Sequence, residues 1–174
     1  MNMDNKHLRE LLGKLVSSEN EDNWWRQELF EKYTRSKIPA GLEILSPPPS
    51  EEQNYNCFVY VLGLQNNENF LGNKGWDFTR NLDLIFDEMI REKIFKPLSK
   101  PEVGSMILYR AHDNSISHVG IMEDENTVIS KWSWGPLLRH KILDVPDHYG
   151  EKIEFYIISE KAGDLILSRH HTLN

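Results

Sequence analysis

Residues 104–132 read GSMILYRAHDNSISHVGIMEDENTVISKW, and they hold three short apolar runs separated by polar turn residues. The runs are rich in the apolar and β-branched residues that strands favour, and they are 104–110, 117–122 and 127–132. Asp113-Asn114 and residues 123–126, which separate the runs, have the composition of hairpin loops. We therefore expect three consecutive antiparallel strands.

Two later segments extend this strand pattern. Residues 153–158 form another apolar run of strand length near the end of the chain. Residues 139–143 would add a short strand before the proline and glycine loop at 146–150. Together with the first three runs, they predict an antiparallel β meander in the second half of the chain.

The first hundred residues show helical spacing instead. Apolar side chains recur three or four residues apart within 4–16 and again within 18–36, so each segment predicts an amphipathic helix. A third helix is predicted after Thr79, a suitable N-cap. Its apolar face would consist of Leu82, Ile85, Phe86, Met89 and Ile90.

Prolines interrupt the helical pattern between residues 38 and 54. The run Pro47-Pro48-Pro49 has fixed φ angles and no backbone N–H groups, which predicts a rigid linker. A chain of 174 residues is long enough for one core and short for two. We therefore expect a single domain with three parts: a docked N-terminal helical extension (1–45), a core (50–160) and a tail (161–174).

Charge and composition exclude several classes of function. The formal net charge is −7, whereas binding to phosphate backbones needs clustered lysine and arginine, so no nucleic-acid partner is expected. No apolar run approaches the eighteen or so residues of a membrane span, and residues 1–10 do not resemble a signal peptide. The single cysteine excludes an internal disulfide. A cytoplasmic protein without a membrane partner is the expectation, with export of an effector as the alternative.

Cys57 and His118 are the residues best suited to chemistry. Cys57 begins an apolar run that ends at Gly63, and Asn56 is placed to cap a helix that starts at the cysteine. A helix N-terminus favours the thiolate and lowers its pKa. His118 opens the strand 117–122, and a histidine is a suitable base for a thiol. The pair predicts a thiol nucleophile with its base, while inert packing of a buried cysteine is the alternative.

The segments around these two residues resemble the papain-like cysteine hydrolases of the NlpC and CHAP type. The likeness spans 55–158 and rests on 56–63, 103–109 and 117–122. In those families a cysteine begins a helix, and a later His-Val-Gly-Ile strand supplies the base. The resemblance implies a papain-like α+β fold with N-terminal helices packed on an antiparallel meander. It also implies that Cys57 is the nucleophile and His118 the base.

A closer likeness involves residues on both sides of this pair. Tyr55-Asn56-Cys57, Ser130-Lys131 and His140 are similar to the pattern of an uncharacterised bacterial domain family. That family has a Tyr-Asn-Cys helix start, a Ser-Lys step after the histidine strand and a later histidine. It has no assigned substrate, so this second resemblance implies a fold rather than an activity.

The third member of the predicted site has several candidates. Papain-like relatives of this type place a histidine, asparagine or glutamine about twelve residues after the base, and Ser130 stands there in this chain. They also have an aspartate where this chain has Ser105. A histidine base needs one ring nitrogen held in place so that the other is free to accept a proton. We expect Ser130, Lys131 or His140 to hold His118.

A substrate groove is predicted beside these residues. Tyr55 and Asn56 precede the nucleophile, and Trp132 and Trp134 follow the Ser-Lys step, so all four are candidates for its walls. The two tryptophans are equally suited to covering the core against the N-terminal helices. The scattered histidines lack the spacing of metal ligands, so no metal or other cofactor is expected.

These observations lead to one main prediction of function and one alternative. The main prediction is a thiol hydrolase of the peptidase or amidase kind, which cleaves or transfers an amide bond of a peptide or protein through a Cys57 thioester. The alternative is a catalytically silent domain of the same fold that binds a protein partner, with the N-terminal helices as a candidate surface. Ser105 and the weak orienting residue Ser130 favour this alternative.

Overall fold

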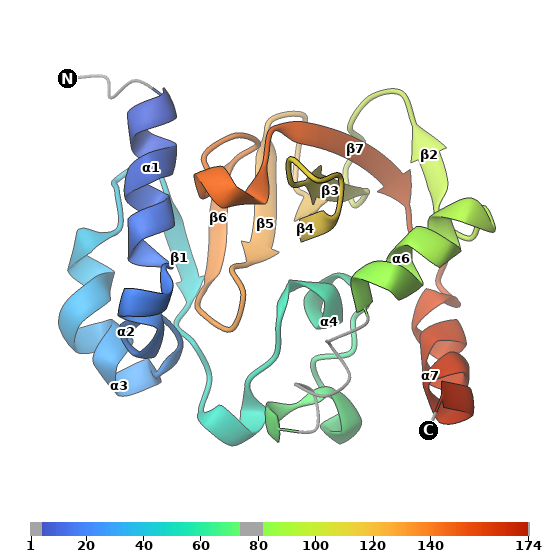
Figure 1. Cartoon of the computed structure of the whole chain (residues 1–174), viewed down its shortest axis with the longest axis horizontal. Helices are drawn as coiled ribbons and strands as arrows, with labels where there is room; N and C mark the ends of the chain where they lie inside the picture. Colours follow the sequence, from blue (N-terminus) through green and yellow to red (C-terminus); the bar gives the residue numbers. More distant parts are fainter. Residues whose placement is uncertain (1–4, 74–81, 174) are drawn as a thin grey trace.

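The computed structural model describes residues 5–73 and 82–173 and confirms the α+β class. Seven strands form one open antiparallel sheet in the order β1-β6-β5-β4-β3-β7-β2 (Figure 1). The strands are β1 Glu43–Ser46, β2 Lys96–Leu98, β3 Met106–Arg110, β4 Ile116–Met122, β5 Thr127–Lys131, β6 Leu137–Lys141 and β7 Lys152–Ile157.

The helices flank the sheet at its two ends and below it. They are α1 Asn5–Leu15, α2 Glu21–Trp25, α3 Gln27–Leu29, α4 Cys57–Val61, α6 Leu82–Arg91 and α7 Ala162–Leu173. The first three lie beside β1, α6 and α7 lie at the opposite end near β2, and α4 lies beneath β4 and β5 (Figure 1). None of the helices in the described part of the chain has the length and apolar character needed to cross a bilayer.

The predicted meander is confirmed as the run β3-β4-β5-β6, with β7 added beside β3. Two edge strands were not predicted from the sequence. β1 lies within the segment that was predicted to be only a proline-rich linker, and it pairs with β6 just before Pro47. β2 contains Pro97, and proline is tolerated on an edge strand because one side of the strand needs no N–H donor.

The single helix predicted for residues 18–36 is wrong. The chain breaks at Arg26, whose backbone is extended (φ −85°, ψ 118°), so α2 ends at Trp25 and α3 starts at Gln27. A π-helical turn over Phe30–Thr34 and a 3₁₀ turn over Arg35–Lys37 follow. The break turns Trp24 and Phe30 toward the same core, where their rings meet edge to face at 5.9 Å.

The two faces of the sheet carry two separate apolar clusters. The first cluster contains α4, α6 and α7 residues packed against Leu108 and Val119. The second contains residues of α1 and α2 and Phe30 of the π-helical turn, packed against Tyr109 and Trp132. The N-terminal extension is therefore part of the core, because the Trp24 indole N–H also donates to the Trp132 carbonyl at 3.0 Å.

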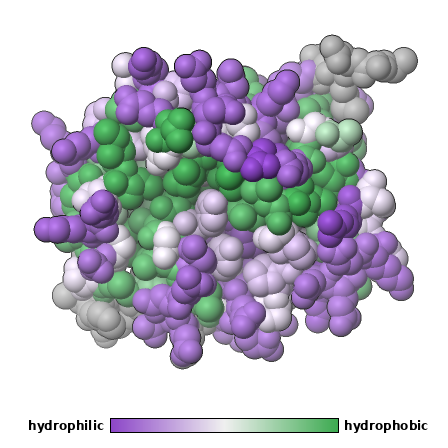
Figure 2. Space-filling model, turned by 180° about the vertical axis from the view of Figure 1, so that it is seen from behind, coloured by the Kyte–Doolittle hydropathy of each residue, from purple (hydrophilic) through white to green (hydrophobic). Residues whose placement is uncertain are grey.

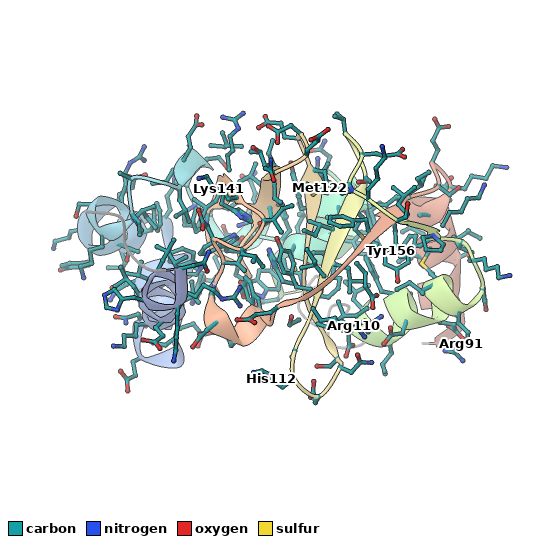
Figure 3. The ribbon with its side chains drawn as sticks, turned by 90° about the horizontal axis from the view of Figure 1, so that it is seen from above. Arg91, Arg110, His112, Met122, Lys141 and Tyr156 are labelled. Atoms are coloured by element: carbon teal, nitrogen blue, oxygen red, sulfur yellow. The ribbon has the colours of Figure 1, made fainter. Side chains whose placement is uncertain are left out.

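α6 and α7 cover the first cluster. The predicted apolar face of α6 is confirmed for Leu82, Ile85, Phe86 and Met89, which are buried, and Ile90 is half-buried; Thr79 lies outside the described residues. Arg110 joins β3 to α6 through Asp87 at 3.0 Å and to β7 through Glu154 at 3.1 Å (Figure 3). The segment predicted as a tail forms α7, whose Ala162 and Ile166 are buried against α4 residues.

Candidate functional site

α4 begins at Cys57, as predicted, because Asn56 caps it. The side-chain oxygen of Asn56 accepts hydrogen bonds from the backbone N–H groups of Phe58 at 3.1 Å and Val59 at 3.2 Å. This N-cap is typical of asparagine and satisfies two of the free donors of the first turn. Asn56 is buried and its acceptor is occupied, so in this structure it shapes the helix start rather than the wall of a groove.

Cys57 is buried at the junction of α4 and β4. Its side chain is 4% exposed, and the sulfur accepts from the backbone N–H groups of Val119 and Phe58. Burial raises the pKa of the thiol to about 11, and these donors only partly oppose the shift. The expectation of a lowered thiol pKa is therefore wrong for this state: α4 has five residues, too short for a strong dipole, and desolvation outweighs it.

His118 lies on the face of the sheet opposite to the side chain of Val119, because successive strand residues alternate. The imidazole is completely buried and stacks on the Tyr149 ring, with centroids 4.2 Å apart and an angle of 11°. The peptide that joins His118 to Val119 donates its N–H to the Cys57 sulfur. Cys57 itself belongs to the apolar cluster on the Val119 face. The sulfur and the imidazole therefore lie toward opposite faces of β4, and no hydrogen bond between their side chains occurs in the described structure.

Ser130 connects His118 to His140 across three neighbouring strands. The Ser130 hydroxyl oxygen lies 3.0 Å from Nε2 of His118 and 2.7 Å from Nε2 of His140. The indole N–H of Trp132 donates to the same hydroxyl at 3.0 Å. Nδ1 of His140 lies 2.8 Å from the backbone carbonyl of Lys141. We call this chain of contacts the Ser130 array.

The Ser130 array determines which nitrogen of His118 carries the proton. A carbonyl only accepts, so His140 must donate from Nδ1, and in its neutral form it accepts at Nε2. Ser130 therefore gives its single hydroxyl hydrogen to His140. Its oxygen can then only accept, from Trp132 and from Nε2–H of His118. Nδ1 of neutral His118 is left with a free lone pair, and this buried atom has no hydrogen-bond partner in the described structure.

Both histidines of the array are neutral at pH 7. Burial lowers the pKa of His140 to about 4 and holds the pKa of His118 well below its usual value, with His140 and His148 adding to the second shift. In the unfolded chain both groups take up a proton near pH 6.5. The unfolded state thus binds more protons below pH 6.5, and the protein loses stability as the pH falls.

We expect the unfolding free energy to fall by about 2 kcal/mol per array histidine between pH 6.5 and pH 5. The His140→Gln variant should lose about half of the pH dependence that the array contributes, because of the two array histidines only His118 still titrates differently in the folded and unfolded states. Urea unfolding at pH 7, 6 and 5 measures the slopes. His112→Gln, at an exposed histidine, is the matched control and should keep the wild-type slope. If the unfolding free energy depends on pH equally in wild type and His140→Gln, His140 does not have the lowered pKa assigned to it here.

Lys131 approaches from the face of the sheet opposite to Ser130. Its side chain is 1% exposed, and Nζ donates to the carbonyls of Gly135 and Trp134, the latter at 3.2 Å. The ammonium also lies 5.0 Å from the centroid of the Tyr55 ring. Burial lowers the pKa of Lys131 to about 7, while the nearby Cys57 raises it. Lys131 does not contact His118, so of the three candidates it is Ser130, itself in contact with His140, that contacts His118.

The predicted groove residues divide into two groups. Tyr55 lines a cavity of about 830 Å³ together with Gln65, and Trp134 lines a neighbouring cavity of about 330 Å³ together with Trp25. Trp132 lies in the core instead, where its ring centroid is 6.0 Å from that of Trp24. Its indole N–H donates to the Ser130 hydroxyl, so it is not available to a substrate. Of the two interpretations of the tryptophans, Trp134 thus fits the groove and Trp132 fits the core.

Tyr149 was not identified from the sequence, although it stacks on His118. It follows the loop after β6, and its carbonyl accepts from the Ser117 hydroxyl at 2.5 Å. No motif marked it, because the contact depends on how this loop folds back over β4. No group of three or more histidine, cysteine, aspartate or glutamate side chains converges as a metal site within residues 5–73 and 82–173.

Comparisons with known proteins give one match. A family model described as "Domain of unknown function (DUF7689)" matches residues 48–157. The matched region contains Cys57, Lys131 and the whole Ser130 array, whereas α1–α3, β1 and α7 lie outside it. No curated protein and no solved structure matches the chain.

Proposed function

Because the chain belongs to the DUF7689 family, whose description states no activity, we propose its function from the side-chain geometry: a papain-like thiol hydrolase in which Cys57 is the nucleophile and His118 the base. The observation that carries the proposal is the free, buried lone pair on Nδ1 of His118. A general base needs an unprotonated nitrogen, and the Ser130 array leaves one on His118, the residue before Val119, whose backbone N–H donates to the Cys57 sulfur. Proton transfer requires the sulfur to move from the Val119 face toward the imidazole.

The proposed reaction is acyl transfer through a thioester. The Cys57 proton moves to Nδ1 of His118, and the sulfur attacks the carbonyl carbon of an amide. His118 then returns the proton to the departing amine nitrogen as the carbon–nitrogen bond breaks. Water, deprotonated by the same nitrogen, hydrolyses the thioester and restores the thiol. Ser130 and His140 move no proton in these steps, because they only hold Nε2–H of His118 in place.

The substrate class is a peptide or an amino-acid amide in a cytoplasmic setting. The cavity beside Tyr55 offers space for an extended chain next to the start of α4, and the acidic residues Glu51, Glu52 and Glu68 on its rim favour substrates without negative charge. The thiol is buried at rest, so the substrate must reach it through a rearrangement that admits the amide. The half-buried Tyr55 ring, which separates this cavity from Lys131, is the side chain best placed to move.

A direct test is covalent capture of the acyl group. Wild-type protein is incubated at pH 7.5 with a panel of peptidyl p-nitrophenyl esters and peptidyl aminocoumarin amides, and intact mass is followed by mass spectrometry. We expect an adduct of one acyl group on Cys57 with the esters and slow release of the aminocoumarin from at least one amide. Cys57→Ser should show neither signal. Acylation that persists in Cys57→Ser, or its complete absence in the wild type, would contradict the proposal.

The catalytically silent binding module is the second candidate. It is favoured by the resting state of the thiol, which is 4% exposed and has its pKa raised to about 11. Figure 2 shows apolar surface gathered in a band across the back of the molecule, which is the kind of surface that a protein partner would cover. For this candidate, Cys57 should react with iodoacetamide only after denaturation.

A further inference from the structure

Lys131 is a buried amine with no carboxylate partner among the described residues, and below its pKa of about 7 it carries a positive charge. Among the described residues, no ion pair joins its Nζ to aspartate or glutamate, although the side chain is 1% exposed. Two carbonyls of the β5–β6 turn and the face of the Tyr55 ring take the place of an acid. An uncompensated buried charge is unfavourable, and an apolar side chain of similar length would stabilise the fold better.

The surroundings of Lys131 contain one group that can supply the missing negative charge. Cys57 is two residues after Tyr55, whose ring Lys131 contacts, and it belongs to the apolar cluster on the same face of the sheet as Lys131. Its thiolate and the Lys131 ammonium each favour the charged form of the other. Tyr149, on the opposite face of the sheet, is the other titratable side chain that senses the sulfur, and burial raises its pKa further, so it stays neutral. Tyr55 also stays neutral at pH 7, because burial raises its pKa.

The two groups proposed to act on the sulfur lie on different faces of the sheet. His118 and Ser130 lie on one face and Lys131 on the other, because Ser130 and Lys131 are successive residues of β5. We propose that Lys131 is the charge partner of the Cys57 thiolate, acting from the face opposite to His118, so that the proton acceptor and the stabilising cation of this site are separate residues.

The proposal rests on the proposed hydrolase function and adds one role to it. When the Cys57 proton passes to Nδ1 of His118, the negative charge left on the sulfur faces the Lys131 ammonium. Lys131 exchanges no proton and forms no bond in this step, so atoms and charge balance without a further reactant. Its hydrogen bonds to the Gly135 and Trp134 carbonyls hold the ammonium in place.

Lys131→Met removes the charge and keeps the length of the side chain. At pH 6.5, where Lys131 with its pKa of about 7 is mostly an ammonium, the rate of alkylation of Cys57 by iodoacetamide, followed by intact mass, should fall about tenfold, because alkylation requires the thiolate. Lys131→Arg should recover most of the rate, and Lys141→Met, at an exposed lysine of β6 (Figure 3), should match the wild type. The unfolding free energy of Lys131→Met should equal or exceed that of the wild type.

This last readout separates a charge partner from a structural lysine. A lysine that serves only the fold would make Lys131→Met less stable and leave the alkylation rate unchanged, and an alkylation rate within twofold of the wild type overturns the proposal. The test needs no turnover. If the wild type fails to form an acyl adduct while Lys131→Met still alkylates tenfold more slowly, the hydrolase proposal fails and the charge pairing stands.

Discussion

His118→Gln is expected to lower the rate of Cys57 acylation by a factor of about 10² to 10⁴, the range that general-base catalysis contributes. A glutamine reaches the same place as the imidazole and still offers an amide N–H to the Ser130 hydroxyl, so the array keeps its donor. It lacks a basic nitrogen, so the Cys57 proton has no acceptor at the position of Nδ1. The initial rate of acyl-adduct formation at pH 7.5, with the ester that the wild type uses best, measures the effect.

The control for this variant is His112→Gln. His112 is exposed on the loop between β3 and β4, so its replacement should leave the acylation rate within twofold of the wild type. Thermal unfolding of both variants shows whether the fold is kept. If folded His118→Gln is acylated as fast as the wild type, His118 is not the base, and another group near the sulfur must accept the proton.

Ser130→Ala should give the largest loss of stability, about 3 kcal/mol or more. Its hydroxyl is the meeting point of three hydrogen bonds, from Trp132 and His118 and to His140. Without it, three buried polar atoms lose their partners, and each unsatisfied group costs about 1–3 kcal/mol. Urea unfolding at pH 7 measures the change.

Ser168→Ala is the matched control for this loss. Ser168 is an exposed serine of α7 whose hydroxyl, within the described part of the chain, bonds to the Leu165 carbonyl alone, and its replacement should change the unfolding free energy by about 0.5 kcal/mol or less. If Ser130→Ala lowers the unfolding free energy by less than about 1 kcal/mol, the hydrogen bonds of the array contribute little to stability, and they do not determine the tautomer of His118.

Much of the sheet is predictable because its residues obey local rules. The strands β3, β4 and β5 are apolar runs bounded by turn residues, and their pairing follows from hairpin loops. α4 follows from a single capping residue, Asn56. The break at Arg26 and the strand β1 are different, because both depend on which distant surface the segment packs against. Local propensity favours one continuous helix over 18–36, and tertiary contacts of Trp24 override it.

The candidate site shows the same division. His118, Ser130 and His140 were all identified from the sequence, and strand alternation in neighbouring strands is enough to bring such residues to one face. The tautomer of His118 and the contact with Tyr149 were not predictable, because they depend on distances between atoms of separate elements. The thiol pKa was predicted in the wrong direction, since the sequence shows where a helix begins and does not show how deeply its first residue is buried.

The hydrogen bond from His140 to the Lys141 carbonyl on β6 determines the direction of the hydrogen bonds that Ser130 on β5 and His118 on β4 make. If that peptide rotated to present its N–H instead, His140 would have to accept at Nδ1 and donate from Nε2. The Ser130 oxygen would then accept from His140, and its hydroxyl hydrogen would go to His118. His118 would then become the acceptor of that hydroxyl and would carry its hydrogen on Nδ1, as a donor in place of a lone pair. The polarity of the whole site thus depends on the orientation of a single main-chain group.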